Sequence, residues 1–213
     1  MIGIFDSGSG GLTVVRAIRE RLPSTDVLYF GDIKNAPYGS KAPEELFKLT
    51  ISAIELLKKN GATSIVSACN SVSASLAISL FDALDLTPQS LIEMVGPTVS
   101  YFRGSPAKLL LVATPATIQS GVYQSAFRMI GKDVTAVAIP DLASAIEFGA
   151  PEEKLEECIR GALPKDVASF DAEILACTHY PLALSVFKKL VPPGVVLFDP
   201  ALAVAERVER AFW

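Results

Sequence analysis

Histidine and cysteine are scarce in this sequence of 213 residues, which contains one histidine and three cysteines. Cys69, Cys158 and Cys177 are odd in number and form no C-x-x-C pair, which argues against a disulfide framework and against a zinc site. A lone His179 cannot build a cluster of histidine ligands. We therefore expect reduced thiols and no bound metal.

Charged residues and long apolar runs are also scarce. Charged residues make up 20% of the chain, the net charge is −4 and the basic residues are scattered, which argues against a nucleic-acid partner. Residues 1–6 contain no basic side chain and too few apolar ones for a signal peptide or a membrane span. The sequence thus predicts a cytoplasmic protein that binds neither nucleic acid nor membrane.

Hydrophobic residues are plentiful, at 50% of the chain, which is enough for one large core or two small ones. Short apolar runs alternate with helical patterns along the whole chain, as is typical of an α/β fold with parallel sheets. The expected strands span residues 3–5, 27–30, 63–68, 91–95, 107–113, 134–138, 173–176 and 195–198. The expected helices span residues 12–22, 43–60, 71–84, 114–130, 142–148, 181–190 and 201–212, with another opening at Pro151 and a turn at Gly96-Pro97.

Two of the expected strands end in a thiol that is followed by polar residues. The run 174–176 leads into Cys177-Thr178-His179, and the run 65–68 leads into Cys69-Asn70-Ser71. Ligands bind at the carboxyl ends of parallel strands, so both thiols stand where a site is expected. The helix that follows Cys69 places its N-terminal dipole near the sulfur, which favours the thiolate.

The two halves of the chain repeat one spacing. Asp6 follows an apolar run and precedes Cys69 by 63 positions, and Thr114 follows another run and precedes Cys177 by the same 63. Equal intervals suggest two copies of one α/β unit, although two anchor points also coincide by chance. If the copies face each other, the two thiols flank one cleft from opposite sides.

Each feature also has a plain structural interpretation. A buried cysteine is often core filling, which is our interpretation of Cys158, and a lone histidine is often structural. The glycine-rich turn at 6–11 is either a tight βα turn or an anion cradle, and the polar loop 31–40 is a candidate substrate loop.

Two thiols with Asp6 and His179 placed to assist favour proton chemistry, because one thiol can take a proton from one face of a carbon while the other returns one to the opposite face.

Four segments together resemble the signatures of the glutamate racemases, within the cofactor-independent aspartate/glutamate racemase superfamily. They are D-S-G-S-G-G-L-T-V at 6–14, G-D-x-x-x-A-P-Y-G at 31–39, A-C-N-S at 68–71 and A-C-T-H-Y-P-L at 176–182. The resemblance implies two pseudo-symmetric α/β lobes with an active site in the cleft between them. It also implies inversion of glutamate at Cα without pyridoxal phosphate or metal, with D-glutamate used for peptidoglycan synthesis.

The resemblance carries over residue by residue. Cys69 and Cys177 match the catalytic thiols that deprotonate the D- and L-enantiomers respectively, and Asp6 and His179 match their assisting groups. The residues that match those holding the amino acid are Ser7, Pro37, Tyr38, Gly39, Asn70, Ser71, Thr178, Thr114 and Thr117. Ser71 stands where the family usually has threonine, and the chain is shorter than typical members by roughly a fifth on domain-length expectations.

The expected lobes are residues 1–91 with 199–213, and residues 92–198. The implied partner is a small amino acid, and a homodimer is allowed. Two other functions stay open at this point: a racemase for aspartate or another amino acid, and a non-catalytic relative that binds a ligand or a partner. Retention of both thiols, Asp6 and His179 favours an enzyme, whereas a one-methylene difference between substrates is worth only about 1–3 kcal/mol and leaves little trace in a sequence.

Overall fold

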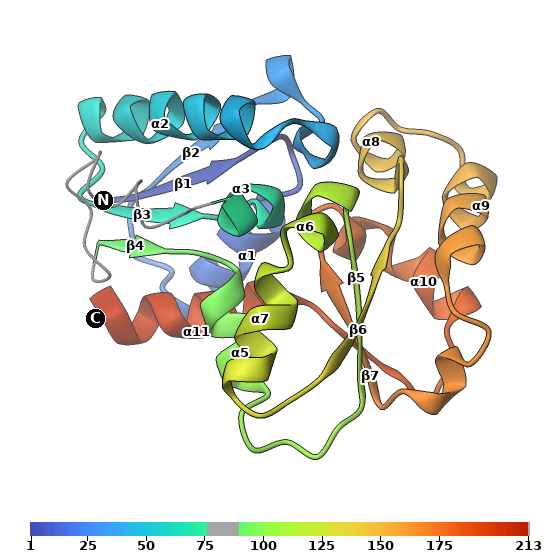
Figure 1. The fold of residues 1–213 in the computed structure, drawn as a ribbon. Helices are drawn as coiled ribbons and strands as arrows, with labels where there is room; N and C mark the ends of the chain where they lie inside the picture. The colour runs from blue at the N-terminus through green and yellow to red at the C-terminus, as the bar shows by residue number, and fades with distance from the viewer. Residues whose placement is uncertain (76–89, 213) are drawn as a thin grey trace.

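The chain forms two α/β lobes, each built on a four-stranded parallel sheet (Figure 1), which confirms the predicted fold class. The structure is a computed structural model that describes residues 1–75 and 90–212. The first sheet has the order β2-β1-β3-β4, with β1 Ile2–Asp6, β2 Val27–Gly31, β3 Ser64–Ser67 and β4 Leu91–Ile92. The second has the order β6-β5-β7-β8, with β5 Leu109–Ala113, β6 Val134–Ala138, β7 Ala172–Ala176 and β8 Val196–Phe198.

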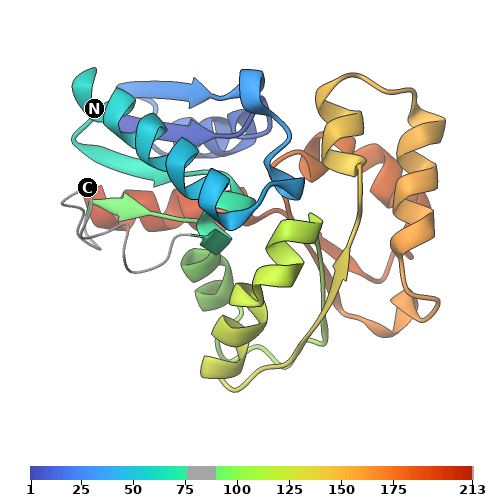
Figure 2. The same ribbon diagram turned by 45° about the horizontal axis from the view of Figure 1, so that its top comes forward.

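Helices cover both faces of each sheet (Figures 1 and 2). In the first lobe they are α1 Leu12–Arg21, α2 Pro43–Lys59 and α3 Asn70–Ser75. In the rest of the chain they are α5 Val95–Tyr101, α6 Pro115–Ser120, α7 Val122–Met129, α8 Leu142–Glu147, α9 Glu152–Ala162, α10 Leu184–Leu190 and α11 Pro200–Phe212. Within the two described ranges, no helix combines the length and the apolar character that crossing a membrane requires.

The two sheets repeat one strand order, with β5 to β8 taking the places of β1 to β4. In the first sheet the central strands are β1 and β3, and paired residues such as Ile2 and Ser64 are 62 positions apart in the sequence. In the second sheet the central strands are β5 and β7, and paired residues such as Leu109 and Ala172 are 63 positions apart. The strand ends that carry the thiols therefore occupy equivalent places, as the repeated spacing predicts.

The chain crosses between the lobes after the fourth strand of each sheet. After β4, α5 packs against α7 of the second lobe, and after β8, α11 returns to pack along α1 of the first (Figure 1). Val204 and Val208 of α11 share a buried core with Ile4 and Ile18. This packing supports our proposal that residues 199–213 join 1–91 in one lobe and that 92–198 form the other, although β4 itself extends to Ile92.

Two local predictions were wrong, and part of a third lies outside the described residues. Gly96-Pro97 is not a turn but lies in the first turn of α5, where a proline costs nothing because its missing N–H would have no helical partner. The Glu93 carboxylate accepts hydrogen bonds from the N–H groups of Val95 and Gly96 and thereby starts the helix. The helix expected over 114–130 is broken by Gly121, whose φ of 66° ends α6. Of the helix expected at 71–84, residues 76–84 lie outside the described part.

Glu173 is a carboxylic acid in an apolar core. It is 0% exposed on β7, beside Leu110 and Leu197 of the neighbouring strands. Neither of its carboxylate oxygens has a hydrogen-bond partner among the described residues. Burial raises the pKa of Glu173 to about 7, because nothing near it compensates for lost hydration of the charge.

We expect Glu173→Leu to stabilise the protein, and the gain to grow with pH. Below the ordinary glutamate pKa the acid is protonated both folded and unfolded, and the folded state bears no ionisation penalty. Between the ordinary glutamate pKa and pH 7, Glu173 ionises only in the unfolded chain, so the free energy of unfolding of the wild type falls as the pH rises. Above pH 7 the loss of stability is constant, at about 3 kcal/mol. Thermal unfolding at pH 5 and pH 8 measures this, and equal pH dependence in wild type and variant would contradict it.

Candidate active site

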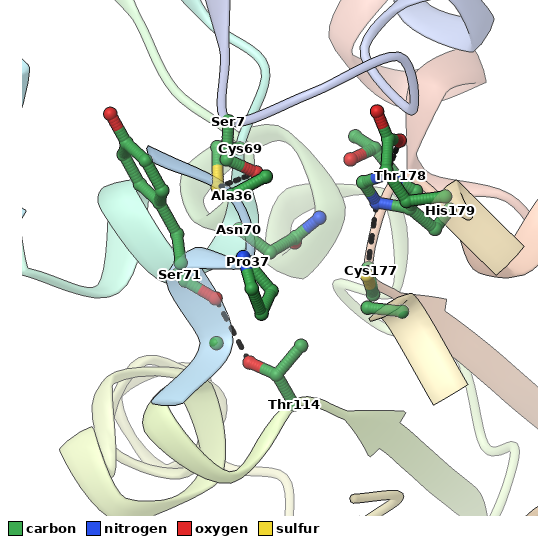
Figure 3. Close-up of a pocket in the computed structure, with 14 residues that line it drawn as sticks. Ser7, Ala36, Pro37, Cys69, Asn70, Ser71, Thr114, Cys177, Thr178 and His179 are labelled. Carbon is green, nitrogen blue, oxygen red and sulfur yellow. Dashed lines mark hydrogen bonds and ion pairs between the residues drawn. The ribbon is translucent and has the colours of Figure 1, made fainter. Parts of the chain in front are cut away.

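The carboxyl ends of both sheets meet at one enclosed pocket between the lobes (Figure 3). Most of the residues predicted for the site line it: Ser7, Pro37, Tyr38, Gly39, Cys69, Asn70, Ser71, Thr114, Cys177, Thr178 and His179. Asp6 and Thr117 do not line the pocket and stand directly behind lining residues, in contact with Thr178 and Ser71 respectively. The lining also includes Ala36, Ala143 and Glu147, which were not predicted.

The two thiols lie on opposite sides of the pocket (Figure 3). Cys69 follows β3 of the first sheet and Cys177 follows β7 of the second, and both are almost fully buried. The Cys69 thiol donates to Ser7 Oγ, with 3.5 Å between the heavy atoms. The Cys177 sulfur is 3.9 Å from Nδ1 of His179. Each thiol therefore has a polar neighbour of its own.

Both thiols are held in the neutral form by their surroundings. Burial raises the pKa of Cys69 to about 12, with a further contribution from the nearby Asp6 charge. Burial likewise raises the pKa of Cys177 well above the ordinary cysteine range. Backbone N–H groups at the start of α3 do lower the pKa of Cys69, but the predicted preference for its thiolate is wrong here, because desolvation outweighs them.

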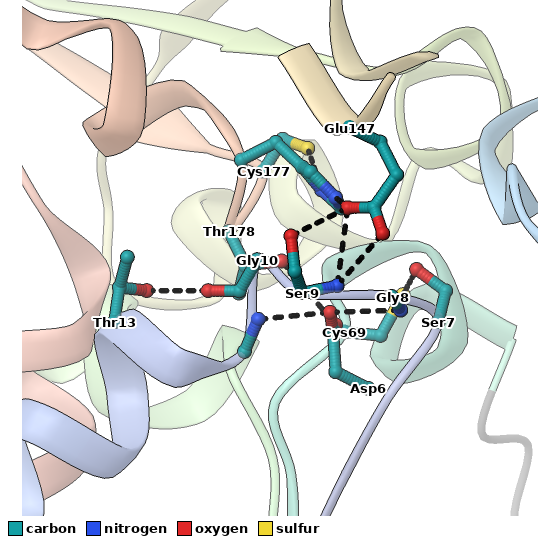
Figure 4. Close-up of polar contacts among 12 residues, drawn as sticks. Asp6, Ser7, Gly8, Ser9, Gly10, Thr13, Cys69, Glu147, Cys177 and Thr178 are labelled. Atoms are coloured by element: carbon teal, nitrogen blue, oxygen red, sulfur yellow. Dashed lines mark hydrogen bonds and ion pairs between the residues drawn. The ribbon is translucent and has the colours of Figure 1, made fainter. Parts of the chain in front are cut away.

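The glycine-rich turn after β1 is an anion cradle that the protein fills with its own carboxylates (Figure 4). Oδ2 of Asp6 accepts from the N–H groups of Gly8 and Gly11 at 3.2 and 2.8 Å. The N–H of Ser9 points the other way and donates to Glu147. Burial raises the pKa of Asp6, an effect that the His179 charge and these backbone N–H groups oppose.

Glu147, at the end of α8, completes the group around Cys177. Its Oε2 is 2.5 Å from Nε2 of His179, and the same oxygen accepts from the Ser9 hydroxyl at 2.7 Å (Figure 4). Burial opposes its ionisation, but hydrogen bonds from Ser9 and His179 lower the pKa of Glu147 overall. Cys177, His179 and Glu147 thus form a chain in which the carboxylate orients the imidazole toward the sulfur.

Asp6 makes no comparable contact with the other thiol. Among the described residues, the side-chain hydrogen-bond partner of Cys69 is Ser7, and Oδ1 of Asp6 accepts instead from Thr178 of the second lobe at 3.2 Å. The carboxylate is nevertheless close enough for its charge to raise the pKa of the Cys69 thiol. A role for Asp6 beside Cys69 therefore rests on proximity of charge, not on a direct bond.

Contacts among three hydroxyl groups join the two lobes beside the pocket. Ser71 Oγ is 2.9 Å from Thr114 Oγ1 and 3.3 Å from Thr117 Oγ1, and the two threonine oxygens are 3.1 Å apart. Thr114 also caps α6 by accepting from the Thr117 N–H. The threonine pair predicted for the site is thus in contact with the serine that follows Asn70.

The loop 31–40 contributes Ala36, Pro37, Tyr38 and Gly39 to the pocket lining. The Tyr38 ring is buried and its hydroxyl donates to Asp32 Oδ2 at 2.7 Å. A Cβ atom on Gly39 would come within 2.7 Å of Thr114 Cβ, and one on Gly10 would come within 2.7 Å of His179 Nδ1. Glycine at both positions is therefore what lets the lobes approach this closely.

The lobes are closed on an almost filled pocket. Its free volume is about 20 Å³, which is roughly the room of one water molecule. An amino acid enters only if the lobes separate, and the contacts that must then break include Ser9 with Glu147 and Ser71 with Thr114.

Cys158 takes no part in the site: it is half-buried on α9, where it packs against the core of the second lobe.

Comparison with known sequences identifies relatives along the whole chain. The sequence model of the family described as Asp/Glu/Hydantoin racemase matches residues 10–208. A glutamate racemase from Ruegeria sp. (strain TM1040) is 36% identical over 221 residues, covering 96% of this chain and 82% of the relative. This chain thus spans about four-fifths of the length of that relative.

Solved structures agree with these relatives. A glutamate racemase isoform from Bacillus anthracis superposes with a TM-score of 0.87 at 29% identity, covering 99% of this chain and 80% of that one. The glutamate racemase from Francisella tularensis, solved in complex with D-glutamate, superposes with a TM-score of 0.83 at 28% identity, covering 98% and 79%. The two-lobed architecture therefore has close counterparts among solved proteins.

Proposed function

The chain belongs to the Asp/Glu/Hydantoin racemase family and is an amino-acid racemase, and we propose that it interconverts L- and D-glutamate with Cys69 and Cys177 as proton carriers. The observation that carries this proposal is the pair of thiols on opposite sides of one pocket (Figure 3). Inversion at a carbon needs a base on one face and an acid on the other, and two facing thiols supply both.

The proposed reaction moves one proton off Cα and another onto it. From L-glutamate, the Cys177 thiolate takes the Cα proton, and the electron pair of the broken C–H bond is delocalised into the adjacent carboxylate. The Cys69 thiol then delivers its proton to the opposite face, which yields D-glutamate and a Cys69 thiolate. The reverse reaction uses the thiols in exchanged roles, so no other reactant is consumed.

The groups beside the thiols support the ionisation that this scheme needs. A thiol with a raised pKa is a poor base until a neighbour accepts its proton. We propose that His179, oriented by Glu147, accepts the Cys177 proton, and that Asp6, whose own pKa is raised by burial, accepts the Cys69 proton. Closure of the lobes removes water, so a carbanion at Cα is not quenched by solvent.

Glutamate is favoured over aspartate by the comparisons, because the relatives quoted above are glutamate racemases that the chain matches along nearly its full length. Aspartate remains the second candidate substrate, since one methylene changes binding by only about 1–3 kcal/mol. A relative that only binds its ligand would need neither the two thiols nor the chain of His179 and Glu147.

The function is tested by incubating the purified protein with L-glutamate, D-glutamate, L-aspartate and D-aspartate in separate reactions. We expect both glutamate enantiomers to reach a 1:1 mixture, and aspartate to react at least about tenfold more slowly, in line with the methylene difference. Addition of a chelator is expected to leave the rate unchanged. Faster conversion of aspartate would replace the proposed substrate, and no conversion of either amino acid would remove the racemase.

The same proposal implies a use for the product and a cellular location for the enzyme. D-glutamate is a building block of peptidoglycan, and the enzyme is proposed to supply it in the cytoplasm, where L-glutamate is abundant. The partner on which the proposal depends is this small amino acid. A homodimer, which the family resemblance allows, stays a prediction that sedimentation of the free protein can test.

A further inference from the structure

Asn70 presents a free hydrogen-bond donor to the pocket. It is the first residue of α3, is 2% exposed, and lines the pocket near both thiols (Figure 3). Its Nδ2 atom is buried and has no hydrogen-bond partner among the described residues. An unpaired buried donor is costly, so a group that faces a ligand pocket in this state is suited to bind an acceptor on the ligand.

The other end of the same amide is held by a tyrosine from the opposite lobe. The Tyr123 hydroxyl, on α7, donates to Asn70 Oδ1 at 2.6 Å. Tyr123 is 0% exposed, its ring packs in the core of the second lobe with Phe127, and it does not line the pocket. Burial raises the pKa of Tyr123 above its ordinary range, so the hydroxyl keeps the proton that it donates.

This contact decides which end of the amide faces the ligand. An asparagine side chain presents a carbonyl oxygen on one side and an NH₂ group on the other, and the two ends are similar in size. A donor fixed at Oδ1 leaves the NH₂ group as the free end. If the amide turned over, its oxygen would face the pocket and repel a carboxylate, and the Tyr123 hydroxyl would have to accept from the NH₂ group instead of donating.

We propose that Tyr123 is a positioning residue for amino-acid binding, which holds the Asn70 amide with its NH₂ group toward a carboxylate of the substrate. This inference rests on the proposed function. It means that a residue of the second lobe, Tyr123, helps the first-lobe residue Asn70 to bind the ligand. Tyr123 does not line the pocket, and its contact with the site is the hydrogen bond to Asn70, while its hydroxyl also interacts with Thr98 in the core of the second lobe.

The test is Tyr123→Phe, which removes the hydroxyl and keeps the ring in the core. We expect KM for glutamate to rise by about tenfold in both directions, the scale of one lost hydrogen bond, while kcat falls by less than about threefold. In an Asn70→Ala background, where no amide remains to be oriented, the same substitution is expected to leave KM unchanged.

Tyr180→Phe is the matched control. Tyr180 is also a fully buried tyrosine of the second lobe, and it donates one hydrogen bond, to the carbonyl of Ile139 at 3.2 Å. We expect both tyrosine variants to lower Tm by similar amounts, but only Tyr123→Phe to raise KM. An unchanged KM in Tyr123→Phe, or an equal rise of KM in the presence and absence of the Asn70 amide, would overturn the inference.

A second variant keeps the inference testable if Tyr123→Phe does not fold. Asn70→Asp is close in shape, still accepts from Tyr123, and places an acceptor where the NH₂ group was. It is expected to raise KM more than Asn70→Ala does, and a KM equal to that of wild type would reject the pocket-facing donor. Failure of the wild type to racemise glutamate is a separate result, which counts against the proposed function.

Discussion

Replacement of Cys69 by serine is expected to abolish racemisation in both directions, by at least about 10³-fold, and to spare one partial reaction. Each turnover needs one group to take a proton and a second to give one, so loss of either thiol stops the complete reaction. Elimination from a glutamate with chloride at Cβ needs only removal of the Cα proton and departure of chloride. Cys69→Ser should therefore still eliminate from the enantiomer that Cys177 deprotonates, the L-form.

Cys177→Ser is the matched counterpart. It should eliminate from the D-form and not from the L-form, because Cys69 remains on the opposite side of the pocket. Release of 2-oxoglutarate and chloride, measured with each enantiomer and each variant, gives four rates. Two high and two low rates in a crossed pattern are expected. If both variants lost elimination from the same enantiomer, one thiol would carry out all deprotonation, and the assignment of one thiol to each face would be wrong.

The second large effect is expected at the groups beside the thiols. His179→Asn should slow deprotonation of L-glutamate by about 10²–10⁴-fold, the usual contribution of a proton-transfer partner, because its Nδ1 faces the Cys177 sulfur. Asp6→Asn should act mainly on the Cys69 side and slow deprotonation of D-glutamate. Glu147→Gln keeps the shape of the carboxylate and should reduce the L-direction less than His179→Asn, since it only orients the imidazole.

The asymmetry of these effects is the informative quantity. Rates of Cα hydrogen exchange measured separately from pure L- and pure D-glutamate distinguish the two sides of the site. Cys158→Ser is the control, because Cys158 lies on α9 and does not line the pocket. Equal losses in both directions for His179→Asn would indicate that the histidine holds the substrate or the fold and does not serve one thiol.

The strand ends were predictable because parallel sheets impose a simple rule on a sequence. Both thiol strands are short apolar runs that stop at polar residues, and the carboxyl ends of such strands meet at one edge of the sheet. By the same rule, Asp6 is the last residue of the central strand β1, and Thr114 directly follows the central strand β5. The two thiols, Asp6 and His179 could therefore be predicted from strand ends, whereas the residues expected to hold the amino acid were predicted from the resemblance of four segments to the racemase signatures.

Glu147 and Tyr123 could not be predicted, because their roles depend on how the two lobes meet. Glu147 ends a short helix whose packing within the second lobe brings it to His179, and the contact between the lobes brings it to Ser9. Tyr123 fits an apolar helix face, and nothing local to it indicates a bond to Asn70. No periodicity or spacing encodes a contact between rigid units, so such residues appear only in three dimensions.

The wrong local predictions have a related cause. Gly96-Pro97 has the composition of a turn, but Glu93 caps the following N–H groups and starts α5 there. The pKa of Cys69 was misjudged because the helix start after it is visible in the sequence, whereas the burial of the thiol, which outweighs the helix, depends on packing in the folded structure. At α5 a nearby carboxylate decides the outcome, and at Cys69 burial decides it.

The measurement that tests the two-thiol account most directly is isotope incorporation in D₂O at low conversion. Starting from L-glutamate, a separate proton carrier on each face predicts that newly formed D-glutamate carries deuterium at Cα, while recovered L-glutamate remains unlabelled. The same pattern is expected in reverse from D-glutamate. Transfer of the original hydrogen into the product, or early labelling of the recovered substrate, would show that a single group serves both faces and would contradict the account.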